Sequence, residues 1–289
     1  MGPRIPAAAR VCWNRGIPMN APLRGNLTLA YAGSVALAAG MAIASGAGLM
    51  FRDAVYPSRD LLQTFWPNDV VNLAVGLPVL LASLWLAHRG VLAGLLLWPG
   101  ALLYVLYNDL VPLFCMPLNM AFLVELVLVA LSIYTSAAVV VSIDGAAVRE
   151  RLRGRVHEKA CGAIMAVMGA LFVLRAAGML IAASLKGAPV GTPEVALNVT
   201  DFLITPLWII GGTLLWRRRA LGYVAGLGLL FQCSMLFIGL ILYMILQPFI
   251  TGRPAAAVDV LVVLAMGLLF FVPFGLFLRG VNRGAKSTS

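Results

Sequence analysis

Two short polar motifs lie where long apolar stretches begin, and their residue types could do chemistry. Asp69 and Asn72 open one apolar stretch, and Asn198 and Asp201 open another 129 positions later, with acid and amide exchanged. Asp69 and Asn198 can be explained as helix N-caps, because their side chains accept hydrogen bonds from first-turn amides. Asn72 and Asp201 lie almost one turn further along the same predicted face. We therefore expect Asn72 and Asp201 in particular to line a polar site, and we keep Asp69 and Asn198 as candidates beside them, since polar and ionisable groups inside a membrane are functional candidates by default.

Glu125 and Arg175 are charged residues well inside other apolar stretches. Each lies eight or nine positions from the same predicted end of its stretch, which corresponds to a depth of roughly 12 to 14 Å at the helical rise per residue. At equal depth the two side chains can be partners. A structural ion pair and a functional role remain open alternatives. Further candidates for the wall of a polar cavity are Tyr104, Asn108 and Gln232.

The composition predicts an all-α, polytopic integral membrane protein. Hydrophobic residues make up 62% of the 289 residues and charged residues only 11%, against about a quarter in soluble domains. The apolar stretches lack the alternation of barrel strands, so we expect helices. Eight stretches approach the roughly 20 residues that span a bilayer, with the third the shortest. They cover residues 27–51, 69–87, 91–108, 118–142, 160–185, 196–216, 220–247 and 255–278.

Cysteine and histidine usage offers little support for a metal or redox centre. The four cysteines are scattered without a Cys-x-x-Cys pair, and the only histidines are His88 and His157 in predicted loops. We read the cysteines as packing residues and expect no metal site, no haem and no other cofactor.

The second half of the chain repeats features of the first. Matched residues are displaced by 128 or 129 positions and keep their order, which predicts a duplicated four-helix unit. An even number of spans inserts both copies the same way up, so the repeats should be parallel, with a site where they face each other. The matches beyond the polar motifs are Gly33, Gly40, Ala47, Pro78, Gly94 and Gly100 with Gly162, Gly169, Ala176, Pro206, Gly222 and Gly228.

Basic residues predict the orientation and the partners of the chain. Sixteen of the 21 lysines and arginines fall in the termini and alternate loops, so both termini should be cytoplasmic in the cell (plasma) membrane. These loops should contact anionic lipid headgroups, which accounts for the net charge of +10 without nucleic acid. The oligomeric state is left open. The predicted units are a disordered tail (1–25), a first repeat (26–142), an amphipathic connector (143–159), a second repeat (160–280) and a C-terminal tail (281–289).

Three functions are compatible with this pattern. The first is an acidic, polar cavity that opens at the outer face between the repeats and binds or transports a cation or small polar solute. The second is a membrane enzyme that acts on a lipid or isoprenoid headgroup, with Glu125 or Asp201 as general base and Arg175 holding a phosphate. The third is a non-catalytic subunit that binds quinone or helps to assemble a membrane complex. The sequence favours the first hypothesis because acidic residues concentrate at the predicted outer end.

Overall fold

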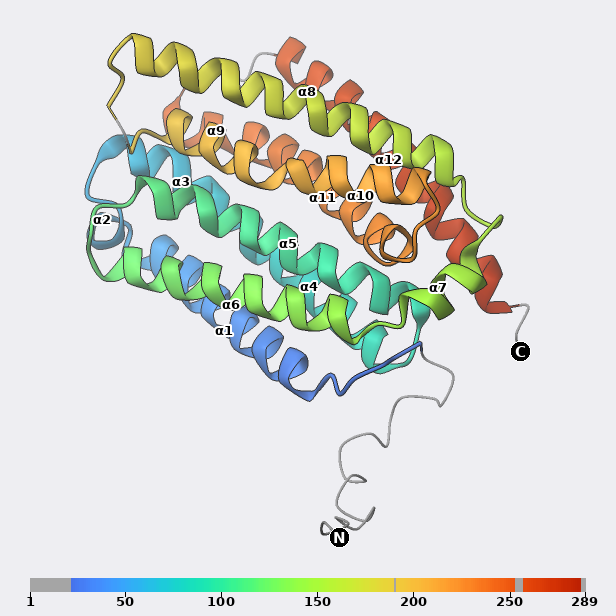
Figure 1. Cartoon of the computed structure of the whole chain (residues 1–289). Helices are drawn as coiled ribbons and strands as arrows, with labels where there is room; N and C mark the ends of the chain where they lie inside the picture. The colour runs from blue at the N-terminus through green and yellow to red at the C-terminus, as the bar shows by residue number, and fades with distance from the viewer. Residues whose placement is uncertain (1–21, 190, 253–256, 287–289) are drawn as a thin grey trace, which may run out of the picture.

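The computed structural model describes residues 22–189, 191–252 and 257–286, and it is a bundle of long helices (Figure 1). Within the described residues, eight helical segments are long and apolar enough to cross a membrane, as predicted. The helices are α1 (Thr28–Met50), α2 (Arg52–Val55), α3 (Arg59–Val71), the π-helix η2 (Asn72–Gly76), α4 (Leu77–His88), α5 (Leu92–Cys115), α6 (Met120–Ser142), α7 (Gly145–Leu152), α8 (Glu158–Leu185), α9 (Pro193–Ile204), α10 (Pro206–Trp216), α11 (Ala220–Thr251) and α12 (Ala257–Lys286).

Two of the eight segments are interrupted near their middle. The second segment consists of α3, η2 and α4, and Pro78 follows its π-helical turn. The sixth consists of α9 and α10, which meet at Thr205 before Pro206. Proline removes a helical hydrogen bond and clashes with the preceding turn, so a local change of winding at both positions is the expected result.

The interrupted segments begin earlier than their apolar stretches. Helix α3 starts at Arg59, where the Ser58 side chain accepts a hydrogen bond from the Leu61 amide, and α9 starts at Pro193. Asp69 and Asn198 are therefore buried side chains within helices, and the interpretation of both residues as N-caps is wrong. The segment between the first two predicted stretches, residues 52–68, was expected to be a loop and is largely helical, with Pro67 accommodated inside α3.

Helices α5 and α11 pack against each other at the centre of the bundle. They approach most closely at Gly100 and Gly228, where a Cβ atom on Gly100 would collide with the backbone carbonyl of Gly228. Small residues allow such close backbone contact between membrane helices. Helix α5 runs seven residues past the predicted end of the third stretch, to Cys115, and is the most buried of the eight spans. Its polar residues are enclosed by protein, which explains why hydropathy underestimated its length.

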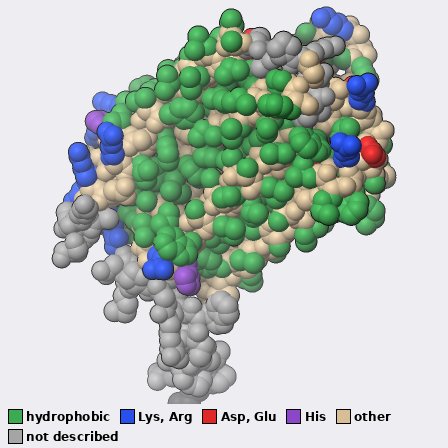
Figure 2. All heavy atoms as spheres, turned by 180° about the vertical axis from the view of Figure 1, so that it is seen from behind, with side chains coloured by type: hydrophobic (Ala, Val, Ile, Leu, Met, Phe, Trp, Pro, Cys, Tyr) green, Lys and Arg blue, Asp and Glu red, His purple; other side chains and the backbone are tan. Residues whose placement is uncertain are grey.

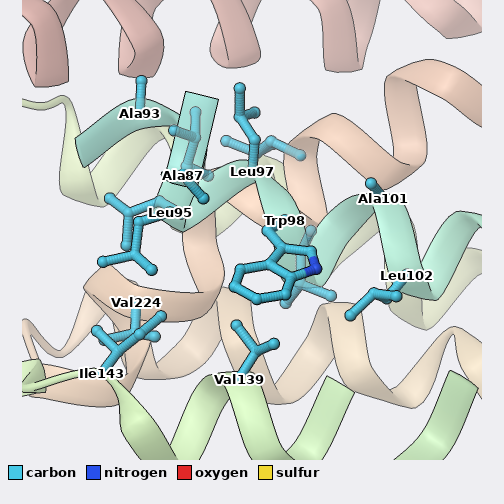
Figure 3. Close-up of a cluster of buried hydrophobic side chains, with 14 of the residues drawn as sticks. Ala87, Ala93, Leu95, Leu97, Trp98, Ala101, Leu102, Val139, Ile143 and Val224 are labelled. Carbon is cyan, nitrogen blue, oxygen red and sulfur yellow. The ribbon is translucent and has the colours of Figure 1, made fainter. Parts of the chain in front are cut away.

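A tryptophan-centred apolar core fills the space beside α5 (Figure 3). Trp98 is completely buried, and its indole Nε1 donates a hydrogen bond to Ser34 Oγ of α1 at 2.9 Å. Val139 of α6 and Val224 of α11 belong to the same cluster. This core fixes α5 against three neighbouring helices and leaves the polar residues further along α5 for the site described below.

The two ends of the bundle differ in structure (Figure 1). One end, here the α7 end, carries α7, whose N-cap Asp144 pairs with Arg24 at 2.9 Å. The opposite end, here the α2 end, carries α2 and the α8–α9 connection. Hydrophobic side chains cover much of the face between the ends (Figure 2). Most of the predicted N-terminal tail, residues 1–21, lies outside the described residues.

Candidate functional site

A cavity of about 690 Å³ lies in the half of the bundle nearer the α2 end. Its walls come from α3, α5, α8, α9, α10, α11 and α12, so residues of both halves of the chain contribute. Most of the lining is apolar, and seven aromatic rings take part. The volume falls in the range of small-molecule sites, about 300 to 1,000 Å³. The cavity is therefore large enough for a drug-sized molecule.

An ion pair on the cavity wall joins α8 to α9. Arg175 Nη2 donates to Asp201 Oδ2 at 2.7 Å, and the Tyr107 hydroxyl donates to Asp201 Oδ1 at 2.7 Å. Asp201 is 3% exposed, whereas the Arg175 side chain is 49% exposed. Both carboxylate oxygens of Asp201 are thus engaged, and Arg175 contributes no uncompensated charge to the wall.

The predicted partnership between Arg175 and Glu125 is wrong. Equal depth in the membrane allowed it, but depth does not determine the direction in which a side chain points. Helices α8 and α9 are consecutive and pack together, which brings Arg175 to Asp201. Glu125 lies on α6 and faces the carboxyl groups of Asp109 and Asp69 instead.

Glu194 is the remaining charged residue on the wall of the large cavity. It lies in the first turn of α9, near the α2 end, and its side chain is exposed. Among the described residues, no lysine or arginine forms an ion pair with Glu194. With Arg175 and Asp201 compensating each other, Glu194 leaves the described lining residues with one excess negative charge.

Aromatic rings surround the deeper part of the large cavity. Phe172 packs edge-on against Trp208 with ring centroids 5.5 Å apart and against Phe237 at 6.3 Å. Trp208 is 2% exposed, and its indole is held by Gln232 Oε1 at 3.2 Å. Aromatic faces attract cations, and a desolvated contact contributes up to about 2 kcal/mol. A cationic group with an apolar body therefore matches this part of the wall.

A second, much smaller cavity of about 10 Å³ lies within the first half of the chain. Asp69 of α3, Asp109 of α5 and Glu125 of α6 line it together with Asn72 of η2. The Tyr56 hydroxyl, from the α2–α3 connection, donates a short hydrogen bond to Asp69 Oδ2. Burial raises the pKa of Tyr56 well above its usual range, and the neighbouring Asp69 carboxyl raises it further. Both effects favour the protonated hydroxyl that donates to Asp69.

The two cavities share part of one wall. Phe65 and Asn68 of α3 and Asn108 of α5 line both of them. Asn108 Nδ2 donates to the Tyr104 carbonyl at 2.8 Å, which holds this amide on its own helix. The predicted site residues are thus distributed over two adjacent cavities rather than gathered in one chamber.

The nine predicted site residues differ in where they lie. Asp69, Asn72 and Glu125 line the small cavity, Asn108 lines both, and Tyr104, Arg175 and Asp201 line the large one. Gln232 lines neither, because its Nε2 donates to the Leu103 carbonyl at 3.2 Å and its Oε1 accepts from Trp208. Asn198 lies outside both lining sets and donates to the Glu194 carbonyl at 2.8 Å.

Most residues of the cavity walls were not among the candidates predicted from the sequence, and those that matter for the site are Tyr56, Tyr107, Asp109 and Glu194. Tyr107 and Asp109 follow Tyr104 along α5, but their importance depends on which face of α5 meets α9 and α6. Tyr56 lies between the first two predicted apolar stretches, in a segment expected to be a loop, and nothing in its local sequence connects it to Asp69. The position of Asp109 inside an otherwise apolar helix was the one signal that could have been used.

Within the described residues, no group of three or more histidine, cysteine, aspartate or glutamate side chains is arranged to hold a metal ion.

Eight apolar spans with an apolar surface and enclosed polar groups define the chain as a polytopic membrane protein embedded in a lipid bilayer. No protein-family model matches the chain, and no curated protein or solved structure shows significant similarity to it.

Proposed function

We propose that the chain binds and transports an amphipathic organic cation in the large cavity. The observation that carries this proposal is the Glu194 carboxylate, which forms no ion pair with another described residue and lies at the α2 end of a cavity whose deeper walls are apolar and aromatic. A cationic head can lie near Glu194 or over an aromatic ring, while the apolar body contacts Phe172, Trp208 and Phe237. A small, fully polar solute would leave most of this wall without a suitable contact.

The exposure of several lining residues supports entry from the bilayer. Leu171 of α8, Leu197 of α9 and Leu240 of α11 line the cavity and are 55%, 39% and 42% exposed. These side chains connect the interior of the cavity to the apolar outer surface of the bundle. An amphipathic molecule dissolved in the membrane can therefore reach the cavity without crossing a polar barrier.

The contacts of Asp201 favour binding over catalysis at this site. A general base needs a carboxylate oxygen that is available to a substrate proton. Both oxygens of Asp201 already accept hydrogen bonds, from Tyr107 and Arg175. The residue fits a structural role, in which it fixes α9 against α5 and α8.

We also propose that the two halves of the chain are parallel copies of one four-helix unit. Several contacts support this. Gly100 and Gly228, which are 128 positions apart, meet where α5 crosses α11. Gly94 abuts Leu86 and Ala87, and Gly222 abuts the equivalent Leu214 and Leu215. Helix α5 packs against α9, just as α11 packs against α3. The large cavity would then lie at the interface of the copies, as in transporters built from repeats.

The orientation proposed from the basic loops places the α7 end in the cytoplasm and both cavities toward the outer face of the plasma membrane. The described basic side chains around α7 support this, because positive residues are retained on the cytoplasmic side. An amphipathic cation would then enter the large cavity from the outer half of the bilayer.

Binding of tetraphenylphosphonium to the protein in lipid nanodiscs tests the proposal, with empty nanodiscs as background. We expect saturable binding that Leu171→Trp weakens about tenfold, equivalent to 1.4 kcal/mol, because the larger ring occupies the cavity. Leu174→Trp is the matched control, since Leu174 lies on the same helix and is 68% exposed outside the cavity. Binding that is equal in the two variants, or no greater than in empty nanodiscs, would contradict the proposal.

A charge variant tests the role of Glu194. Glu194→Gln preserves size and removes the carboxylate, so we expect weaker tetraphenylphosphonium binding with a flatter dependence on salt concentration. Glu150→Gln, an equivalent change on the exposed surface of α7, should leave binding unchanged. An unchanged affinity and salt dependence in Glu194→Gln would show that the cation does not sense this carboxylate.

A further inference from the structure

The small cavity is lined by polar atoms that accept hydrogen bonds and lack donors. Asn72 is 5% exposed, and its Oδ1 has no partner among the described residues. Asp109 is 3% exposed, and neither its Oδ2 nor the buried Oε2 of Glu125 has a hydrogen-bond partner in the described part of the chain. A buried acceptor without a donor costs about 1 to 3 kcal/mol. The cavity therefore requires a species that supplies hydrogen or positive charge.

The charges around this cavity also favour the binding of a proton or another positive charge. The ionisable groups that face it are Tyr56 before α3, Asp69 of α3, Asp109 of α5 and Glu125 of α6, while α1 contributes the uncharged Ser45. No lysine or arginine is among the described residues that line it. Three adjacent carboxylates in a buried site repel one another strongly when all are ionised.

Protons fit the cavity better than a metal ion. Its volume of about 10 Å³ admits roughly one water molecule. The carboxyl groups do not form a metal-holding arrangement within the described residues. A proton needs no convergent ligand shell, because it resides on one carboxyl oxygen and converts that oxygen into a donor for a neighbouring acceptor.

We propose that Asp69, Asp109 and Glu125 form a proton-binding site, and that a cation in the large cavity displaces a proton from it. The second part of this proposal rests on the proposed function of the large cavity. Phe65, Asn68 and Asn108 separate the two cavities, so a positive charge in one acts on the carboxyl groups of the other. The linkage is reciprocal, and raising the proton concentration therefore weakens cation binding.

Infrared difference spectroscopy tests the proton site without any ligand. In wild-type protein, raising the pH should remove the carbonyl stretch of protonated carboxyl groups, and Glu150→Gln should behave identically. The signal should be reduced in Asp109→Asn and in Glu125→Gln, each of which keeps the shape of its side chain. A wild-type spectrum without a titrating carboxyl band, or a full band in both variants, would overturn the proton site. The two variants remove different carboxyl groups of the site, so the comparison with wild-type protein still gives an answer if one of them fails to fold.

Proton release on addition of tetraphenylphosphonium tests the linkage. In weakly buffered solution, a pH indicator should report protons released by wild-type protein and by Glu150→Gln. Release should be reduced in Glu125→Gln, while binding of the probe persists and loses part of its pH dependence. Binding without proton release in wild-type protein would overturn the linkage. Failure of the probe to bind would refute the proposed function and with it the linkage, whereas the infrared result on the proton site would stand by itself.

Discussion

The crossing of α5 and α11 allows a graded test of the scaffold that holds the large cavity. In Gly100→Ala, the added methyl group would lie far inside contact distance of the Gly228 carbonyl, which is backbone and cannot rotate away. In Gly228→Ala, the nearest atom is the Leu96 carbonyl oxygen at 2.9 Å, a milder conflict. Gly178 has no atom within 4 Å of the added position, so Gly178→Ala is the matched control.

The expected magnitudes follow from these distances. Overpacking costs about 1 to 3 kcal/mol, and we place Gly100→Ala at or above the upper end because two helix backbones must separate. Gly228→Ala should cost about 1 to 2 kcal/mol. Gly178→Ala should be neutral or stabilising by up to about 1 kcal/mol, since alanine favours the helix over glycine.

Thermal unfolding of the three variants in nanodiscs, followed by tryptophan fluorescence, measures this order. A loss of about 3 kcal/mol corresponds to a decrease in Tm on the order of 6 to 12 °C for a chain of this size. Because α5 and α11 both line the large cavity, Gly100→Ala should also weaken tetraphenylphosphonium binding. The reasoning would be refuted if Gly100→Ala were as stable as Gly178→Ala.

Three further predictions concern other parts of the chain. Hydrogen bonds from the Arg24 guanidinium and from first-turn amides lower the pKa of Asp144 below its ordinary 3.8. The ionised Asp144 therefore stabilises the folded state above pH 3.8, and this stabilisation is lost as the pH falls through the lowered pKa of Asp144. Hydrogen exchange at the α7 N-terminus should accelerate in acid, and Asp144→Ala should remove this acid dependence. Gln232→Met should cost about 1 to 3 kcal/mol in thermal unfolding, because it leaves a buried indole and a carbonyl unpaired. A cysteine replacing Arg59 should react with a membrane-impermeant thiol reagent on intact cells, and one replacing Arg153 only after lysis; the reverse pattern would refute the orientation.

The sequence was sufficient to predict the eight spans, because hydropathy and length report directly on membrane insertion. It misplaced the start of the second span at Asp69, since Pro67 and the polar residues before it resemble a loop. The structure shows that residues 59–71 form a helix with Pro67 inside it. The polar residues around Pro67 therefore lie inside α3, where Asp69 is buried, and they do not indicate a helix end.

The candidate site was predicted in part. Asp69, Asn72, Asp201 and Glu125 were recognisable because each is a polar residue within or beside an apolar stretch. Their grouping was not predictable, since position along a helix gives depth but not rotation about the helix axis. Only the packing of α9 against α5 and α8 shows that Asp201 faces Arg175.

The position of a bound cation tests the central claim most directly. Tetraphenylarsonium can be located by the anomalous scattering of its arsenic atom in crystals grown from lipid. We predict one arsenic peak inside the large cavity, between Glu194 and the rings of Phe172 and Trp208, and its loss in Leu171→Trp. An arsenic peak on the outer surface of the bundle, or a large cavity that is filled by ordered water in the presence of the probe, would contradict the account.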